Sequence, residues 1–160
     1  YPEKYKNVWG DALKAGYAKR DASRPKMDIQ AGGMLAIDES LTGEDQQKVL
    51  DFARPSTALY VGGMGARGKN FYNDICKAYG FEQEAVEIQD LYLDGKKQEA
   101  AAKIPADWLL NSHLVGPKSF IKERLAAYKE AGVTVLQVNP IGPDAVKQVE
   151  LLRSLMDDVK

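Results

Sequence analysis

Residues 114–140, LVGPKSFIKERLAAYKEAGVTVLQVNP, place an amphipathic stretch between two apolar runs. The stretch after Gly116 repeats its apolar residues at helical spacing and ends at Gly132, the residue type that most often stops a helix. On either side of this helix, Ser112–Val115 and Val133–Val138 have the length and composition of short strands. A strand, a helix and a strand joined by short turns predict parallel strands and a right-handed crossover.

The same alternation extends to both sides of this stretch. Downstream, Asn139–Gly142 is predicted to turn the chain before a helix that Pro143 opens. The predicted inward stripe of that helix comprises Val146, Val149, Leu152 and Met156. Upstream, residues 28–37, DIQAGGMLAI, form an apolar run of strand length that Gly32 and Gly33 loosen. Neither this run nor VTVLQV alternates cleanly between apolar and polar residues, so we expect both strands to be buried on both faces.

Helical patterns dominate the remainder of the chain. Apolar residues recur at helical spacing, and the helices are predicted over residues 5–16, 42–52, 71–79, 81–93 and an alanine-rich run that ends at Lys103. Periodicity does not decide whether Ala58–Val61 forms a strand or continues a helix that starts at Pro55. We find no repeat and no linker, so residues 1–160 are interpreted as a single domain.

Composition excludes several classes of function. The chain has 22 basic and 23 acidic residues, and this balance predicts neither a nucleic-acid partner nor a membrane partner. The longest apolar run, Ala58–Val61, is far too short to span a bilayer. A single cysteine, Cys76, rules out an internal disulfide and fits the reducing cytoplasm. A single histidine, His113, rules out a metal site with several histidines, and no metal is expected.

Residues 62–70, GGMGARGKN, resemble two phosphate-binding motifs at once. From Gly63 onward they match a nucleotide P-loop except at Asn70, which lacks the hydroxyl group that would hold Mg²⁺. The same glycines also match the G-x-G-x-x-G dinucleotide fingerprint, and both motifs require a preceding strand. Two other interpretations remain: the glycines allow a helix to break and pack tightly, or Arg67 and Lys69 face an anion.

Three stretches together resemble the C-terminal half of a luciferase-like oxidoreductase. They read ARPSTALYVGGMGARGKNFYND, EIQDLYLDGKK and LVGPKSFIKERLAAYKEAGVTVLQVNP, and the similarity runs from about Tyr1 to Met156. The resemblance is closer to the branch that uses the deazaflavin coenzyme F420 than to enzymes that use FMN. It implies a partial (β/α)8 TIM barrel with about three parallel strands. Residues 28–37, 112–115 and 133–138 would be strands six, seven and eight.

The resemblance also implies a function. The parent enzyme would transfer a hydride between F420 and a small organic substrate, and the protein would orient a cofactor that supplies the chemistry. Because much of the cofactor contact in this family comes from the first half of the barrel, we expect the chain alone to be inactive. An FMN-dependent monooxygenase remains an alternative, as does a non-catalytic half-barrel that acts by association. The expected partner is the N-terminal half-barrel or a second copy.

Candidate site residues follow from the expected barrel. The resemblance places Ser56–Met64 in a helix, so the glycine-rich stretch loses the strand that a phosphate loop requires. Barrel sites lie at the carboxyl ends of the strands, and the residues expected there are Asp38, Glu39, Ser40, Gly116, Pro117, Lys118 and residues 139–144. Arg67, Lys69 and Asn139 are the candidate cofactor ligands. No residue is assigned as a catalytic acid or base, and His113 and Cys76 are interpreted as structural.

The glycine-rich stretch gives a first testable prediction. Calorimetric titration of the chain with ATP or GTP should show no saturable heat that depends on Mg²⁺, because Asn70 has no hydroxyl group and no strand is expected before Gly63. Saturable binding that Lys69→Ala abolishes would contradict this prediction.

Overall fold

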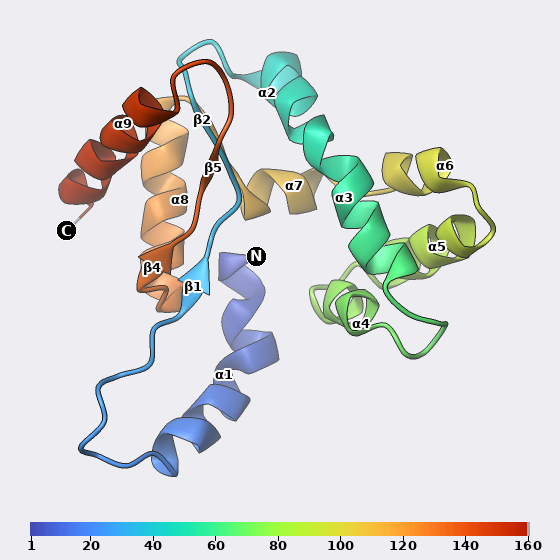
Figure 1. Cartoon of the computed structure of the whole chain (residues 1–160), viewed down its shortest axis with the longest axis horizontal. Helices are drawn as coiled ribbons and strands as arrows, with labels where there is room; N and C mark the ends of the chain where they lie inside the picture. The colour runs from blue at the N-terminus through green and yellow to red at the C-terminus, as the bar shows by residue number, and fades with distance from the viewer. Residues whose placement is uncertain (160) are drawn as a thin grey trace. The chain divides into compact units, whose positions relative to one another are not determined.

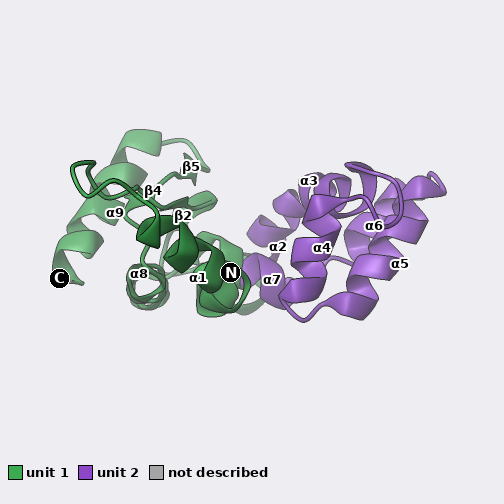
Figure 2. Cartoon of the chain, turned by 90° about the horizontal axis from the view of Figure 1, so that it is seen from below, with its two compact units in different colours: residues 1–46, 111–160 green, residues 47–110 purple. Residues whose placement is uncertain are grey.

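The computed structural model describes residues 1–159, which form two compact units. Unit 1 contains residues 1–46 and the chain from residue 111 onward, and unit 2 contains residues 47–110 (Figure 2). Within the described residues, all strand pairs are parallel, and helices connect β2 to β3 and β3 to β4. The predicted class, a partial α/β barrel with about three parallel strands and many helices, is therefore confirmed.

Unit 1 contains the strands and the helices that cover them (Figure 1). These elements are α1 (Pro2–Ala18), β1 (Gln30–Ala31), β2 (Met34–Ile37), β3 (Leu114–Gly116), α8 (Lys118–Ala131), β4 (Val135–Leu136), β5 (Asn139–Pro140) and α9 (Ala145–Asp158). Helix α8 ends as predicted at Gly132, which has a left-handed φ of 91°.

The strand expected over residues 28–37 is divided into β1 and β2 at the predicted glycine pair. Gly32 approaches Gln137, between β4 and β5, so closely that a Cβ atom would overlap the Gln137 carbonyl oxygen. A Cβ atom on Gly33 would overlap the imidazole of His113. Close backbone approach therefore explains why both positions require glycine. The division lets β1 pair with β4, while β2 pairs with β3 and β5.

The last strand differs from the sequence-based prediction in extent and in position. Asn139 was expected in a turn, but it lies in β5 opposite Met34. The backbone N–H groups of Asn139 and Ile141 donate to Gly33 and Leu35, at 2.9 and 2.8 Å. These bonds extend the strand beyond Val138 and explain the correction. They also give the order β3-β2-β5, so the last strand lies beside β2 and not beside β3.

One face of this sheet packs against α8 and α9. Leu35, Ile37 and Leu114 from the strands are buried in one core with five helical residues. The helical members are Ile121, Leu125, Tyr128, Leu152 and Leu155. The predicted inward stripe of α9 is wrong at its start, since the side chains of Val146 and Val149 are 69% and 45% exposed. Leu152 of the predicted stripe is buried as expected, whereas Met156 is exposed and Leu155 makes the second buried contact of α9 in its place.

The opposite face of the sheet is exposed only along its last strand, and there it is more polar than expected. In β2 and β3 the same face is buried, at Ala36 and Val115. Along the last strand, Val135, Gln137 and Asn139 are exposed, while the residues between them are half-buried. The prediction that this strand is buried on both faces is therefore wrong. Gln137 and Asn139 carry carboxamides, so most of the exposed face can hydrogen-bond to water and its exposure costs less than that of an apolar face.

The chain between β2 and β3 is helical throughout its regular parts. The elements are α2 (Gly43–Leu50), a 3-10 turn (Asp51–Ala53), α3 (Arg54–Ala58), a π-helical turn (Leu59–Gly63), α4 (Phe71–Ala78), α5 (Glu82–Leu93), α6 (Lys97–Ala102) and α7 (Ala106–Ser112). Residues 58–61, which the sequence left undecided between helix and strand, are helical. Gly63 thus follows a helix, and the context that a phosphate loop requires is absent.

The glycine-rich stretch is a packing junction in unit 2. Cβ atoms on Gly62 and Gly63 would overlap the side chain of Tyr92 on α5. The buried side chain of Asn70 closes the loop that follows. Its Oδ1 accepts from the N–H groups of Tyr72 and Asn73 as the N-cap of α4, and its amide donates to the carbonyls of residues 60 and 61.

This junction predicts a large effect of Asn70→Ala on stability. The substitution removes the N-cap and the amide that donates to the carbonyls of Tyr60 and Val61. Of these two carbonyls, that of Val61 keeps the side-chain amide of Asn73 as a donor. We expect the free energy of unfolding to fall by about 2–4 kcal/mol. Denaturant unfolding measures this loss. Gln98→Ala, at an exposed position of α6, is the matched control and should change stability by less than about 0.5 kcal/mol. Equal stability of the two variants would contradict the proposed role of Asn70.

Candidate functional site

The carboxyl ends of the parallel strands meet at one edge of unit 1. The N–H of Asp38, directly after β2, donates to the carbonyl of Gly116 at the end of β3, at 3.2 Å. Ile141, directly after β5, donates to Leu35 of β2. The three loops that the sequence placed at the barrel mouth therefore start side by side.

Asp38 and Ser40 form a closed turn in the first of these loops. The N–H and hydroxyl of Ser40 donate to Asp38 Oδ1 at 2.8 and 2.6 Å. The hydroxyl bond, then the backbone bond, lowers the pKa of Asp38 below its ordinary value. The Asp38 carboxylate is therefore ionised at neutral pH, which fits an acceptor and does not fit a general acid.

Two glutamine side chains bind backbone groups at the ends of the strands at this edge. Gln148 of α9 accepts from the N–H of Ile37 at 2.7 Å and donates to its carbonyl at 3.2 Å. Gln46 of α2 donates to the carbonyl of Val115 at 2.7 Å. Sequence reasoning missed both residues, because a glutamine on a helix has the pattern of an exposed polar position. Only the strand register shows which backbone groups lack a neighbouring strand.

The two helices that begin at this edge differ at their N-termini. Helix α9 is capped by Asp144, whose carboxylate accepts from the N–H of Lys147 at 3.0 Å. Helix α8 follows Pro117, which makes no side-chain cap, and it starts with the exposed Lys118. The N-terminus of α8 thus combines helix-end N–H groups with a cation, an arrangement that favours an anion.

The three candidate cofactor ligands do not all belong to the same unit. Arg67 and Lys69 lie on one loop of unit 2, whereas Asn139 lies on β5 of unit 1. Arg67 Nε is 2.6 Å from Asp90 Oδ1, and its Nη2 is 4.0 Å from Asp94 Oδ1. These carboxylates already balance the charge of Arg67, so an added anion would have to compete with them. Lys69 is exposed on the same loop.

Asn139 borders a polar cleft on the open face of the sheet. The cleft has a volume of about 320 Å³ and is lined by Gln30, Gln137, Asn139 and the backbone at Gly32 and Gly33. The amide of Gln30 donates to the carboxamide oxygen of Gln137. The cleft therefore offers planar amide donors and acceptors without a charged group.

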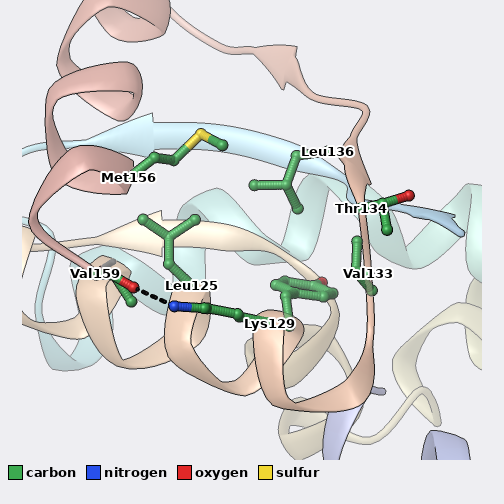
Figure 3. Close-up of a pocket in the computed structure, with 8 residues that line it drawn as sticks. Leu125, Lys129, Val133, Thr134, Leu136, Met156 and Val159 are labelled. Atoms are coloured by element: carbon green, nitrogen blue, oxygen red, sulfur yellow. Dashed lines mark hydrogen bonds between the residues drawn. The ribbon is translucent and has the colours of Figure 1, made fainter. Parts of the chain in front are cut away.

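A second pocket in unit 1 is apolar and lies away from these loops. Figure 3 shows side chains of α8, α9 and the segment around β4 pointing into a space of about 140 Å³. At its rim, Lys129 Nζ donates to the carbonyl of Val159 at 3.0 Å. The lining is mostly aliphatic and continues the core, which identifies the pocket as incomplete packing between the two helices and the strand.

The single histidine and cysteine have structural surroundings. Burial, aided by the nearby amino terminus, lowers the pKa of His113 to about 4. Its neutral Nδ1 accepts from the N–H of Met34 at 3.2 Å. Cys76 is fully buried, and burial raises the pKa of its thiol to about 12. Neither group is suited to catalysis at neutral pH, in agreement with the structural interpretation of both residues.

Residues 1–159, the part of the chain that the structure describes, bear on the possible classes of function in two ways. No helix there combines the length and the apolar character needed to cross a membrane. In the same residues, no group of three or more histidine, cysteine or acidic side chains is arranged to hold a metal ion.

The parallel strands and covering helices define part of an α/β barrel protein, and sequence comparison supplies the family. A family model described as luciferase-like monooxygenase matches residues 1–135. The chain therefore belongs to the luciferase-like monooxygenase family.

Comparison with curated proteins gives a relative from Mycobacterium tuberculosis, named provisionally as a coenzyme F420-dependent oxidoreductase. The two sequences are 28% identical over 152 residues, which are 95% of this chain and 43% of that protein. The chain thus spans less than half the length of this relative. No solved structure matches the chain significantly.

The environment of His113 predicts a pH-dependent stability. The folded state keeps His113 neutral down to about pH 4, whereas the unfolded chain binds a proton below its ordinary pKa of 6.5. The free energy of unfolding should therefore fall as pH decreases from 6.5 toward 4, by up to about 3 kcal/mol. Urea unfolding between about pH 7 and pH 4.5 measures the slope.

His113→Asn is the control for this experiment. The variant should be less stable at neutral pH but should lose most of the slope between about pH 6.5 and pH 4.5, because the titrating group is gone. An unchanged slope in the variant would assign the pH dependence to other groups and refute the role of His113.

Proposed function

We propose that this chain is the C-terminal part of an oxidoreductase that transfers a hydride between coenzyme F420 and a small organic substrate. The observation that carries the proposal is the similarity to the mycobacterial relative, which extends over 95% of the chain. The family match and the parallel strands support the same enzyme class. We place the enzyme in the cytoplasm, in keeping with its one buried cysteine.

The residues of the strand edge fit a role in binding and orientation. The uncapped N-terminus of α8 and Lys118 fit an anionic group. The exposed Lys69, which belongs to unit 2, is a separate proposed contact for an anion. Asn139 fits the hydrogen-bonding edge of a planar ring, because its carboxamide lies in a cleft of amides. Arg67 is the weakest of the proposed ligands, since Asp90 already accepts its hydrogen bond.

When bound, the deazaflavin supplies the hydride chemistry, and the protein supplies position and electrostatics. The ionised Asp38 can only accept hydrogen bonds at neutral pH, and His113 is neutral and occupied by Met34. We therefore assign no proton transfer to these groups. Asp38 instead fixes the loop that follows β2 through Ser40, and His113 fixes the start of β2 through Met34.

We further propose that residues 1–160 form one half-barrel piece that associates with an N-terminal half-barrel or a second copy. A parallel sheet normally has cover on both faces, whereas one face of this sheet is exposed along its last strand, at Val135, Gln137 and Asn139. The exposed Val146 and Val149 on α9 add apolar surface that a neighbouring helix would cover. Alone, the chain should be inactive, because it contains too few strands to close a barrel.

A binding and turnover experiment tests the function. F420 and FMN are titrated separately into the chain and into the longer protein obtained by placing the N-terminal part of the mycobacterial relative before Tyr1. We expect the longer protein to bind F420 in preference to FMN and to bleach its absorbance when it takes up a hydride. Preference for FMN would favour a flavin-dependent monooxygenase, and no binding of either by a folded protein would refute the proposal.

Single substitutions in the longer protein test the proposed ligands. Lys69→Ala should weaken F420 binding about tenfold, the effect expected for one partly exposed charge-assisted bond. Lys14→Ala, an exposed lysine on α1, is the matched control and should leave the dissociation constant unchanged. Equal binding by both variants would remove Lys69 from the site.

A further inference from the structure

The edge of β2 that faces β5 is paired along a continuous segment. Beyond the bonds from Asn139 and Ile141, the N–H of Gln137 donates to Ala31 at 2.9 Å. The N–H groups of Thr134 and Val135 both donate to Ile29, at 2.9 and 3.2 Å. Residues 134–141 thus run parallel to residues 29–35 and are hydrogen-bonded to them along their length. This one segment pairs with both β1 and β2.

This pairing conflicts with the strand order of a closed barrel. In an eight-stranded barrel each strand lies between its predecessor and its successor along the chain. β2 would have β3 on one edge and a strand from the preceding part of the barrel on the other. The last strand of this chain would lie beside β3. In the observed order, β3-β2-β5, it occupies the edge that the preceding strand would need.

The outer edge of β3 is held in a different way. Asp38 donates to Gly116, so the backbone groups of Gly116 point toward β2 and those of Val115 point away from it. The outward carbonyl of Val115 is bound by the side chain of Gln46. On the β5 side of β2, the backbone groups of Ile37 are bound by Gln148. At both places, a glutamine side chain therefore binds backbone groups of a strand that have no neighbouring strand as a partner.

Residues 134–141 are held by backbone hydrogen bonds and by side-chain bonds at Thr134 and Gln137. Their apolar side chains Leu136 and Val138 are only half-buried where they pack against the core. The side chains of Val135, Gln137 and Asn139 are exposed, and Pro140 has no N–H to donate. By contrast, Leu114 and Val115 of β3 are completely buried. The β2–β3 pair is thus fixed by core packing, whereas the β2–β5 pair has less packing to lose when it separates.

We propose that this edge of β2 is the docking edge for a parallel strand from the preceding part of the barrel, and that residues 134–141 hold it until that strand arrives. The incoming strand replaces the bonds to Gly33 and Leu35, and the displaced segment moves to the outer edge of β3, where Gln46 releases Val115. The inference rests on the proposal that the chain is half of a barrel. It adds that the last strand changes partners when the barrel closes.

Cysteine cross-linking reports which strands are neighbours. Met34→Cys with Asn139→Cys joins two positions that lie opposite each other in β2 and β5. Ala36→Cys with Val115→Cys joins opposite positions in β2 and β3 and is the matched control. Each pair is tested under mild oxidation in the 160-residue chain and in the longer protein with the N-terminal part of the mycobacterial relative.

We expect the control pair to cross-link in both proteins. The 34–139 pair should cross-link in the chain and lose at least about tenfold in yield in the longer protein, as its two strands separate. Equal yield of the 34–139 pair in both proteins, with the control pair formed, would overturn the exchange. Absence of the 34–139 cross-link in the chain itself would overturn the pairing on which the exchange depends. F420 binding by the longer protein is scored separately, so loss of the function and loss of the exchange are distinguishable.

If the longer protein fails to form the control cross-link, hydrogen exchange in the chain alone tests whether residues 134–141 separate from β2 independently of the core. The amides of Asn139 and Ile141 should exchange at least about tenfold faster than that of Asp38, which bonds to β3, because the segment opens independently of the core. Equal protection of these three amides would show that the segment is part of the core and would overturn the proposal.

Discussion

The satisfaction of the backbone hydrogen-bonding groups of β2 is the constraint on which unit 1 depends. β2 is the central strand, with β3 on one edge and β5 on the other. Where β5 ends, the carboxamide of Gln148 takes over at Ile37, and the imidazole of His113 accepts from Met34 at the start of the strand. A buried backbone group without a partner is costly, so α9, the last strand and the loop before β3 are all held in place by this one strand.

The sequence predicted the elements of the fold well where local patterns decide them. Gly132 ended α8 as expected, and the pair Gly32 and Gly33 divided the first strand. The sequence failed where the answer depends on a partner far along the chain. Asparagine is common in turns, but Asn139 pairs with Met34 along the edge of β2 and therefore belongs to a strand. Likewise, Val146 fits an inward stripe by spacing, while the observed placement of α9 leaves it exposed.

The candidate site shows the same division between local and distant information. Position along the chain was sufficient to bring together the loops after β2, β3 and β5, because parallel strands end at a common edge. The roles of individual side chains depended on contacts that spacing does not report. The charge of Arg67 is balanced by Asp90. Asn70, which departs from the P-loop pattern, is the N-cap of α4. Gln148 binds the backbone of Ile37 where no neighbouring strand does. Lys69, Asn139 and the start of α8 remain as proposed contacts for a cofactor.

The central claim is that this sheet is an incomplete part of a luciferase-like barrel and needs a partner. Light scattering of the purified chain at micromolar concentration, together with binding of a hydrophobic dye, tests this claim most directly. We expect a mass above that of the monomer, or a monomer that binds the dye through the exposed Val135 of the last strand and the exposed valines of α9. A monomer that melts cooperatively and binds no dye would show that the half-barrel is complete by itself and would contradict the claim.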